Sequence, residues 1–230
     1  MRKFFLTVFM LTLFILSLKA QEEVQGEAAP ETKGFFSTIS WFAQGTILFF
    51  PEHNGMASDP MPVLPSLGAG ASYPFTKIFR AELTLDFYMT HYGYALGRAV
   101  PNAIENRSSL VIGSLLAFQA AAYFNVNSFM TIRVYGGPAA DLRIVIVAED
   151  LNSYDMEDAQ RQTDAVRNYF WSSGRWFMPV MGAGMDFTLN PRVKLGIDMR
   201  VWAPVYRLWT GEDLPAIEGW RFGPGVRLSF

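Results

Sequence analysis

The chain contains no cysteine, and its 230 residues include only two histidines, His53 and His91. Disulfide bonds and thiolate metal sites are therefore excluded, and a zinc site or a histidine-based triad would need one of these two residues. Charged residues make up only 17% of the chain, and the net charge of −2 provides no basic field for nucleic acid. We expect no metal site, no cofactor and no nucleic-acid partner.

Hydrophobic and aromatic residues are abundant, at 50% and 15% of the chain, and Phe alone contributes 20 residues. This composition is apolar for a soluble domain, yet it does not follow the pattern of a helical membrane protein. A length of 230 residues allows one or two domains.

The first 34 residues differ from the rest of the chain. Residues 1–20 begin with a basic pair, Arg2 and Lys3, continue as an apolar run and end at Ala20. This pattern predicts a secretory signal peptide cleaved after Ala20; the alternative is an N-terminal membrane anchor, for which the run is short. Residues 21–34 are acidic and hold few apolar side chains, which predicts a disordered lead-in.

Residues 80–88 alternate strictly between polar side chains at even positions and apolar side chains at odd positions. Successive side chains of a β-strand point to opposite faces, so this period of two predicts a strand with one apolar face. Seven other segments alternate less strictly, and one of them, 112–124, is nearly apolar on both faces and is assigned as a strand by its context. The eight predicted strands are 35–49, 66–73, 80–88, 112–124, 130–147, 176–189, 193–206 and 220–230.

The predicted connections alternate in length along the chain. Short turns are expected at 74–78, 125–128 and 190–192, where Pro and Asn provide turn chemistry. Long loops are expected at 51–65, 91–107, 149–167 and 208–219, and residues 155–167 could form a short surface helix. In an up-and-down meander, this places every short turn at one end of the sheet and every long loop at the other.

Two segments carry a resemblance to a known group of proteins. The last predicted strand, 220–230, is amphipathic and closes on Phe230, as does the closing strand of bacterial outer-membrane β-barrels. The segment 182–202 resembles a hairpin of small barrels of the OmpW and OmpX type. The chain from 35 to 230 therefore resembles the small eight-stranded barrels of the OmpW/OmpX-like superfamily.

The resemblance implies an all-β fold, an eight-stranded antiparallel up-and-down transmembrane β-barrel, in the outer membrane of a Gram-negative cell envelope. It implies outer-membrane lipid and the barrel-assembly machinery as partners, with Phe230 as the assembly signal. The lead-in at 21–34 would then lie in the periplasm, and the long loops would be exposed at the cell surface.

A secreted lipocalin-like calyx has the same number of strands with the two faces reversed, and alternation alone does not separate it from a membrane barrel. The membrane barrel is favoured because the apolar faces carry no charge, which would cost about 2–4 kcal/mol for each Lys or Arg at the bilayer midplane. Aromatic residues also gather at the predicted strand ends, as in interfacial girdles. They are Tyr73, Phe75, Phe124, Phe187 and Phe230 near the short turns, and Trp171, Trp176, Trp209 and Trp220 near the long loops.

The polar faces of the predicted strands define the candidate lumen. Small residues, Gly182 and Gly184 before Arg200 and Gly223 and Gly225 after it, would make room for large side chains in a narrow barrel. The lumen candidates are Arg80, Glu82, Asp86, Arg133, Asp141, Arg143, Asp186, Lys194, Asp198, Arg200, Trp202, Arg221 and Arg227.

The lumen allows two interpretations. Arg80, Glu82, Asp86, Asp198 and Arg200 could pair across the interior as a salt-bridged plug, because buried charges must be paired. They could instead line a narrow polar path, and the resemblance to OmpW suggests a pocket that opens sideways for an apolar ligand.

Neither histidine lies in a recognisable nucleophile arrangement, so we expect no enzymatic activity and no catalytic residue. The sequence predicts passage of a small solute or an apolar ligand across the outer membrane. The alternative is a binding or adhesion protein whose exposed loops engage host or matrix molecules, because loops on a rigid scaffold commonly carry binding.

Overall fold

The computed structural model describes residues 38–51, 63–95, 97–101, 109–147, 156–214 and 219–230. The predicted signal peptide at 1–20 and the predicted lead-in at 21–34 lie outside these residues, as do parts of the four predicted long loops. All that follows concerns the unit formed by residues 39–230.

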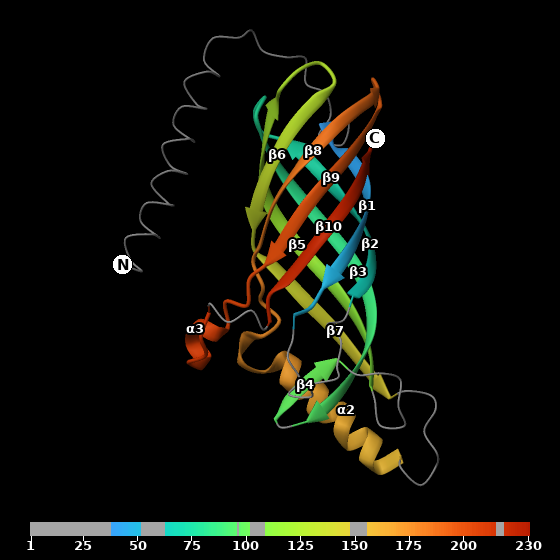
Figure 1. Cartoon of the computed structure of the whole chain (residues 1–230), viewed down its shortest axis with the longest axis vertical. Helices are drawn as coiled ribbons and strands as arrows, with labels where there is room; N and C mark the ends of the chain where they lie inside the picture. The colour runs from blue at the N-terminus through green and yellow to red at the C-terminus, as the bar shows by residue number, and fades with distance from the viewer. Residues whose placement is uncertain (1–37, 52–62, 96, 102–108, 148–155, 215–218) are drawn as a thin grey trace. The chain divides into compact units, whose positions relative to one another are not determined.

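The described strands form one closed antiparallel sheet (Figure 1). Neighbours along the chain pair with one another, and β10 pairs back onto β1, which closes the ring. β6 and β7 act as one wall strand interrupted at Pro138, and both pair with β5. The predicted eight-stranded up-and-down barrel is therefore confirmed. The strands are β1 (Ser40–Phe49), β2 (Val63–Pro74), β3 (Phe79–Ala95), β4 (Arg98–Pro101), β5 (Ser109–Asn125), β6 (Met130–Gly137), β7 (Ala139–Val147), β8 (Val180–Asn190), β9 (Val193–Trp202) and β10 (Arg221–Ser229).

Each of the three short turns is held by one side chain that accepts two backbone hydrogen bonds. Thr76 Oγ1 accepts from the amides of Ile78 and Phe79. Asn127 Oδ1 accepts from the amides of Phe129 and Met130, where β6 begins. Asn190 Oδ1 accepts from the amides of Arg192 and Val193, where β9 begins. Thr and Asn favour turns because their side chains can replace a backbone partner in this way, and the predicted short turns are confirmed.

The predicted strand ends needed correction where proline intervenes. The segment predicted as 176–189 enters the sheet only at Val180, and the segment predicted as 193–206 leaves it at Trp202. Pro179 and Pro204 lie just outside these two limits, and proline has no amide hydrogen for a ladder bond. The first strand is described from Ser40, and residues 35–37 of the predicted strand lie outside the described residues.

The predicted loop at 91–107 is wrong in part. β3 continues to Ala95, and after Gly97, which has a φ of 77°, the short strand β4 pairs back onto it, with Tyr92 opposite Pro101. Sequence alternation did not reveal this hairpin because residues 91–95 do not alternate between apolar and polar side chains. The hairpin extends the wall beyond the barrel (Figure 1).

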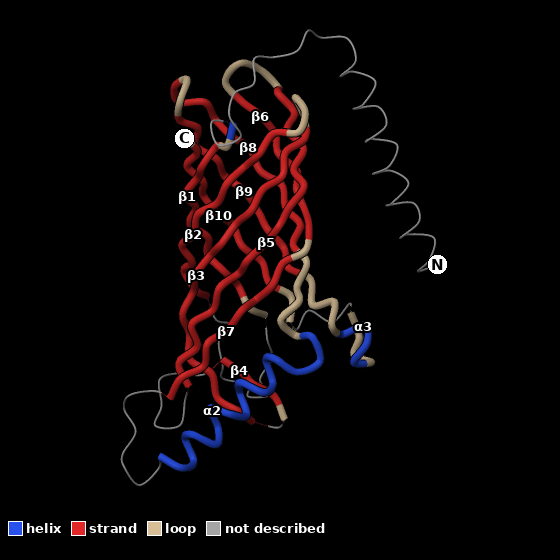
Figure 2. Tube along the Cα trace, turned by 180° about the vertical axis from the view of Figure 1, so that it is seen from behind, coloured by secondary structure: helices blue, strands red, loops and turns tan. Residues whose placement is uncertain are grey.

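The predicted surface helix is confirmed and is longer than expected. α2 (Met156–Trp171) buries a stripe formed by Ala159, Thr163, Val166 and Phe170 at helical spacing. This stripe packs on β3, β4 and β7 at the loop end, where Figure 2 shows α2 crossing the strands. The short helix η2 (Ser172–Gly174) precedes β8, and the short helix α3 (Arg207–Thr210) follows β9. None of the helices in the described ranges is long and apolar enough to cross a membrane.

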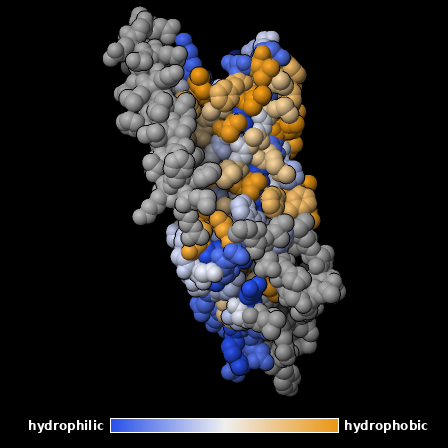
Figure 3. Space-filling view, turned by 60° about the vertical axis from the view of Figure 1, so that its left-hand side comes forward, coloured by the Kyte–Doolittle hydropathy of each residue, from blue (hydrophilic) through white to orange (hydrophobic). Residues whose placement is uncertain are grey.

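The outer face of the wall is apolar. Leu67 on β2 is 73% exposed and Val226 on β10 is 55% exposed, and each strand of the barrel contributes similar residues. Figure 3 shows hydrophobic side chains gathered along the wall, while hydrophilic ones gather at the loop end. The calyx alternative is therefore wrong, because a calyx would carry its charges on this outer face.

The rim at the loop end is uneven in height. β3 and β5 are 17 residues long, whereas β9 and β1 have 10 residues and β10 has 9. A strand of 10 residues is about 33 Å long and, at a tilt of about 40°, rises roughly 25 Å, the height of the apolar band of a membrane barrel. A strand of 17 residues rises roughly 43 Å by the same estimate, so one side of the barrel stands well above the other.

Candidate functional site in the barrel interior

The inward positions of the strands bring the candidate lumen residues together. Eleven of the thirteen candidates are at most 7% exposed, while Arg80 and Lys194 are half-buried at the turn end. The buried ones are Glu82, Asp86, Arg133, Asp141, Arg143, Asp186, Asp198, Arg200, Trp202, Arg221 and Arg227.

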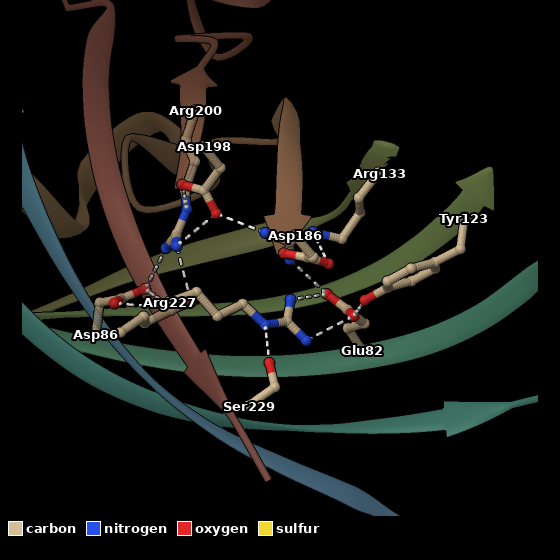
Figure 4. A network of polar contacts seen from close by, with 10 residues as sticks. Glu82, Asp86, Tyr123, Arg133, Asp186, Asp198, Arg200, Arg227 and Ser229 are labelled. Carbon is tan, nitrogen blue, oxygen red and sulfur yellow. Dashed lines mark hydrogen bonds and ion pairs between the residues drawn. The ribbon is translucent and has the colours of Figure 1, made fainter. Parts of the chain in front are cut away.

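Glu82 is the centre of the ionic network nearest the short turns (Figure 4). Arg227 donates two hydrogen bonds to its carboxylate, with N–O distances of 2.9 and 3.0 Å. Arg133 Nη1 lies 3.4 Å from Glu82 Oε2, and the Tyr123 hydroxyl donates a short hydrogen bond to Oε1. The guanidinium of Arg227 also lies 3.4 Å from the ring centre of Phe42, which closes this layer on the β1 side.

Arg133 links this layer to a second group of charges. Its Nη2 lies 2.8 Å from Asp198 Oδ2, and its Nε lies 3.7 Å from Asp186. Arg200 bonds Asp198 at 3.1 Å and Asp86 at 3.3 Å, so the chain of ion pairs crosses the barrel from β6 to β3.

Gln44 completes the second group. Its amide nitrogen donates to both carboxylate oxygens of Asp86 at 2.8 Å, and its amide oxygen accepts from Arg200 Nη2 at 2.8 Å. The interior thus matches the plug interpretation in kind but not in every pair. Arg200 meets Asp86 and Asp198 as expected, whereas Glu82 pairs with Arg133 and Arg227, and Arg80 lies over the ring of Tyr123 at 4.6 Å.

Glycine makes room for the second group. Arg200 stands between Gly182 and Gly223 on the neighbouring strands, and Asp198 stands between Gly184 and Gly225. A Cβ at Gly184 would lie 2.7 Å from Asp198 Cβ, and one at Gly223 would lie 3.1 Å from the ring of Trp202. The predicted role of these glycines, small residues beside large ones, agrees with these distances.

A third group of charges lies closer to the loop end. Asp141 accepts a hydrogen bond of 2.8 Å from the hydroxyl of Tyr88 and contacts Arg143, and its Oδ2 lies 2.6 Å from Arg221 Nη1. The guanidinium of Arg143 lies 3.9 Å from the ring centre of Phe170 on α2. This arginine therefore joins the barrel interior to the helix that covers the mouth.

An apolar layer fills the interior next to these charges, and of the five side chains named below only Trp202 was predicted to face the lumen. Leu48, Phe50, Leu115, Met178 and Trp202 are all buried in one cluster. Leu48 and Phe50 follow the polar inward positions Gln44 and Thr46 on β1, so the change from polar to apolar at even positions was a signal that could have been used.

The described residues contain no group of three or more acidic or histidine side chains placed to hold a metal ion. His91 is half-buried in β3, where its backbone pairs with Leu110, and His53 lies outside the described ranges. The absence of enzymatic activity stays a prediction.

A closed antiparallel barrel with an apolar outer wall and charges paired inside is a transmembrane β-barrel, because the described barrel strands bond to one another around the ring and carry their charges on its inner face. No protein-family model matches the chain, and no curated protein matches it in sequence.

Several small outer-membrane barrels are among the solved structures that resemble the chain. The outer membrane protein OprG from Pseudomonas aeruginosa has a TM-score of 0.49 and 12% identity over 84% of this chain and 96% of that chain. Neisserial surface protein A has a TM-score of 0.48 and 13% identity over 84% of this chain and 97% of that chain. Ail of Yersinia pestis, in complex with the heparin analogue sucrose octasulfate, has a TM-score of 0.42 and 11% identity over 84% of this chain and 97% of that chain. Membership of the OmpW/OmpX-like superfamily stays a prediction.

Proposed function

We propose that this protein is an integral outer-membrane barrel with a closed lumen, and that it acts at its loop end as a non-enzymatic binding protein. The observation that carries this proposal is the filled interior. Three groups of paired charges and an apolar layer occupy successive levels, so a solute would have to break buried ion pairs to pass. Breaking a buried pair costs about 3–5 kcal/mol, which makes the lumen a poor path.

The loop end provides a rigid surface for a partner. Ser109 Oγ and Thr163 Oγ1 are 2.8 Å apart in a buried hydrogen bond between β5 and α2. Phe170 packs edge-on against Tyr92 with ring centres 4.8 Å apart. The opposite side of α2 is exposed and charged, including Arg161, and faces away from the barrel. Exposed segments on a rigid scaffold are where binding residues are commonly found.

The first test is electrical. The chain from residue 21 onward is refolded in detergent, its folding is confirmed by a heat-modifiable gel shift, and currents are recorded across planar bilayers. We expect insertion without discrete conductance steps. Steps whose ion selectivity changes in the Arg200→Ala variant would overturn the closed lumen and make the interior the functional site.

The second test concerns the loop end. Vesicles that carry the protein are applied to surfaces coated with extracellular-matrix proteins. We expect adhesion to be lost in the Arg161→Glu variant of α2 and retained in Arg200→Ala. The binding function would be contradicted if adhesion were lost in Arg200→Ala but retained in Arg161→Glu, or if the unmodified protein did not adhere.

Passage of an apolar ligand is the second candidate, and the wall between β7 and β8 favours it. The backbone of Ala139 and Asp141 bonds Met178 and Trp176, but β8 begins only at Val180, so the later part of β7 pairs with β5 alone. On this open side Arg167 of α2 donates to the carbonyl of Val145 at 3.2 Å. The apolar layer lies next to this opening, so an apolar molecule could move between it and the lipid if α2 swung away.

A disulfide separates the two candidates. The chain has no cysteine, so Ser109→Cys with Thr163→Cys would create a single pair between β5 and α2. If passage is the function, oxidation should stop the uptake of a fluorescent fatty acid into vesicles, and reduction should restore it. If binding is the function, adhesion should be the same in both redox states.

A further inference from the structure

A second surface at the loop end is built by the segments that precede β8 and follow β9. We call residues 172–177 and 203–212 the rim platform. Trp209 Nε1 of α3 donates to the carbonyl of Ser173 in η2 at 2.8 Å, which ties the two segments together. A Cβ at Gly174, which has a φ of 68°, would lie 3.0 Å from the Trp209 ring, so the contact is close.

The rim platform buries its cations and exposes its largest apolar side chains. Arg207 is 6% exposed and lies 3.4 Å from Glu212, and the guanidinium of Arg175 lies 4.3 Å from the ring centre of Tyr169. By contrast, Leu208 is 46% exposed and Trp209 is 56% exposed. A soluble surface would normally show the opposite arrangement, with its cations in water.

The position of the rim platform identifies what covers this surface. It continues the wall at the low side of the barrel, beyond the loop ends of β8 and β9. Figures 1 and 2 show α3 lying to the side of the strands rather than over the mouth of the barrel. The roughly 25 Å height of the short strands ends at the boundary between hydrocarbon and headgroups, so α3 begins where the apolar band stops. Trp176, 39% exposed, lies beside β7, where its carbonyl accepts a hydrogen bond of 2.7 Å from the amide of Asp141.

We infer that the rim platform lies in the interfacial region of the surrounding leaflet, with Leu208 and Trp209 inserted among lipid chains and headgroups. Tryptophan favours this depth because its ring is apolar and its N–H is polar, and here the N–H is already bonded to Ser173. The occupant of the surface is therefore membrane lipid, and the platform anchors the low side of the barrel. On the tall side, the loop ends of β3 and β5, together with α2, extend beyond the level at which the short strands end.

The chain's lack of cysteine makes a depth measurement direct. Three single variants, Leu208→Cys on the platform, Leu67→Cys on the lipid-facing wall and Gln160→Cys on the exposed side of α2, are spin-labelled and refolded into vesicles. Collision with oxygen, which is concentrated in lipid, is compared with collision with a water-soluble nickel chelate. We expect the label at 208 to be shielded from nickel and to resemble the label at 67, whereas the label at 160 should be open to nickel.

Three outcomes would separate the possibilities. A label at 208 that matches the label at 160 would place the platform in water and overturn the inference, leaving a protein partner as the cover. A label at 67 that is also open to nickel would mean that the barrel is not inserted, which contradicts the membrane location itself. If Leu208→Cys does not fold, quenching by brominated lipid in the unmodified chain and in Trp209→Phe gives the same answer, because the quenched component should be lost in the variant.

Discussion

Arg227 on β10 and Glu82 on β3 form a two-pronged ion pair across the barrel interior, although 145 positions separate them in the sequence. Both side chains are at most 3% exposed. The pair sits at the point where Arg133 and Tyr123 also reach the same carboxylate, so three side chains from three other strands depend on one acid. A carboxylate used in this way holds the wall together from the inside.

Neutralising that acid should therefore be costly. The Glu82→Gln variant leaves Arg133 and Arg227 buried without their shared anion, and we expect the free energy of unfolding to fall by about 3–5 kcal/mol. Denaturant titration of the refolded protein, followed by the gel shift, measures the change. Asp158→Asn removes an exposed pair with Arg161 on α2 and should cost less than about 1 kcal/mol. Equal losses in the two variants would show that the network adds nothing.

A methyl group at Gly113 should also be poorly tolerated. A Cβ at this position would lie 2.1 Å from the ring of Tyr88, which is held by its hydrogen bond to Asp141. The Gly113→Ala variant should lose about 1–3 kcal/mol through forced displacement of the ring. Gly45→Ala is the matched control, because the nearest atom to its Cβ would be 3.7 Å away. Thermal unfolding of both variants in the same detergent tests the difference.

α2 should loosen without loss of the barrel when Phe170 is truncated. Its ring contacts Tyr92 and Arg143, and it is 5% exposed. In Phe170→Ala we expect trypsin to cut at Arg161 or Arg167 much faster than in the unmodified protein, because local opening controls the access of a protease. The gel shift should persist. Gln160→Ala on the exposed side of α2 is the control and should leave cleavage unchanged. If cleavage is also unchanged in Phe170→Ala, this contact does not hold the helix.

A charge on the outer wall should oppose insertion. Val226 is 55% exposed and lies between Gly45 and Ile197 in the middle of the wall. Val226→Arg should reduce the free energy of unfolding in lipid by about 2–4 kcal/mol. Glu157→Arg on the exposed side of α2 should change it little. Folding equilibria in vesicles at increasing denaturant compare the two, and an equal effect would argue against lipid at Val226.

The barrel was predictable because alternation fixes which face of each strand is apolar. On β3 and β9 the charged and apolar positions separate cleanly, and all the inward charges found there were predicted. β5 shows the limit of this signal, because Val111 and Leu115 face inward although they are as apolar as its lipid-facing side chains. Its assignment came from the pattern of its neighbours.

The pairing of particular charges was not predictable from alternation. Which residues meet across the barrel depends on the stagger between strands, and period two says nothing of it. Glu82 could not be matched to Arg227 rather than Arg80 on these grounds. The hairpin with β4 was missed because residues 91–95 do not alternate. The break at Pro138 was missed because the alternation continues across it, with Val134 before it and Leu142 after it both on the outer face.

The pairing of β10 with β1 has a consequence for the order of events in folding. Arg227 on the last strand reaches Glu82 on β3, which also pairs with Arg133 on β6, so no sheet that lacks its last strand can satisfy Glu82, Arg133 and Arg227 together. Closing such distant contacts is slow, and a half-formed sheet would expose both a charged face and two free edges to lipid. The barrel should therefore assemble in one concerted step, with its strands and its insertion completed together.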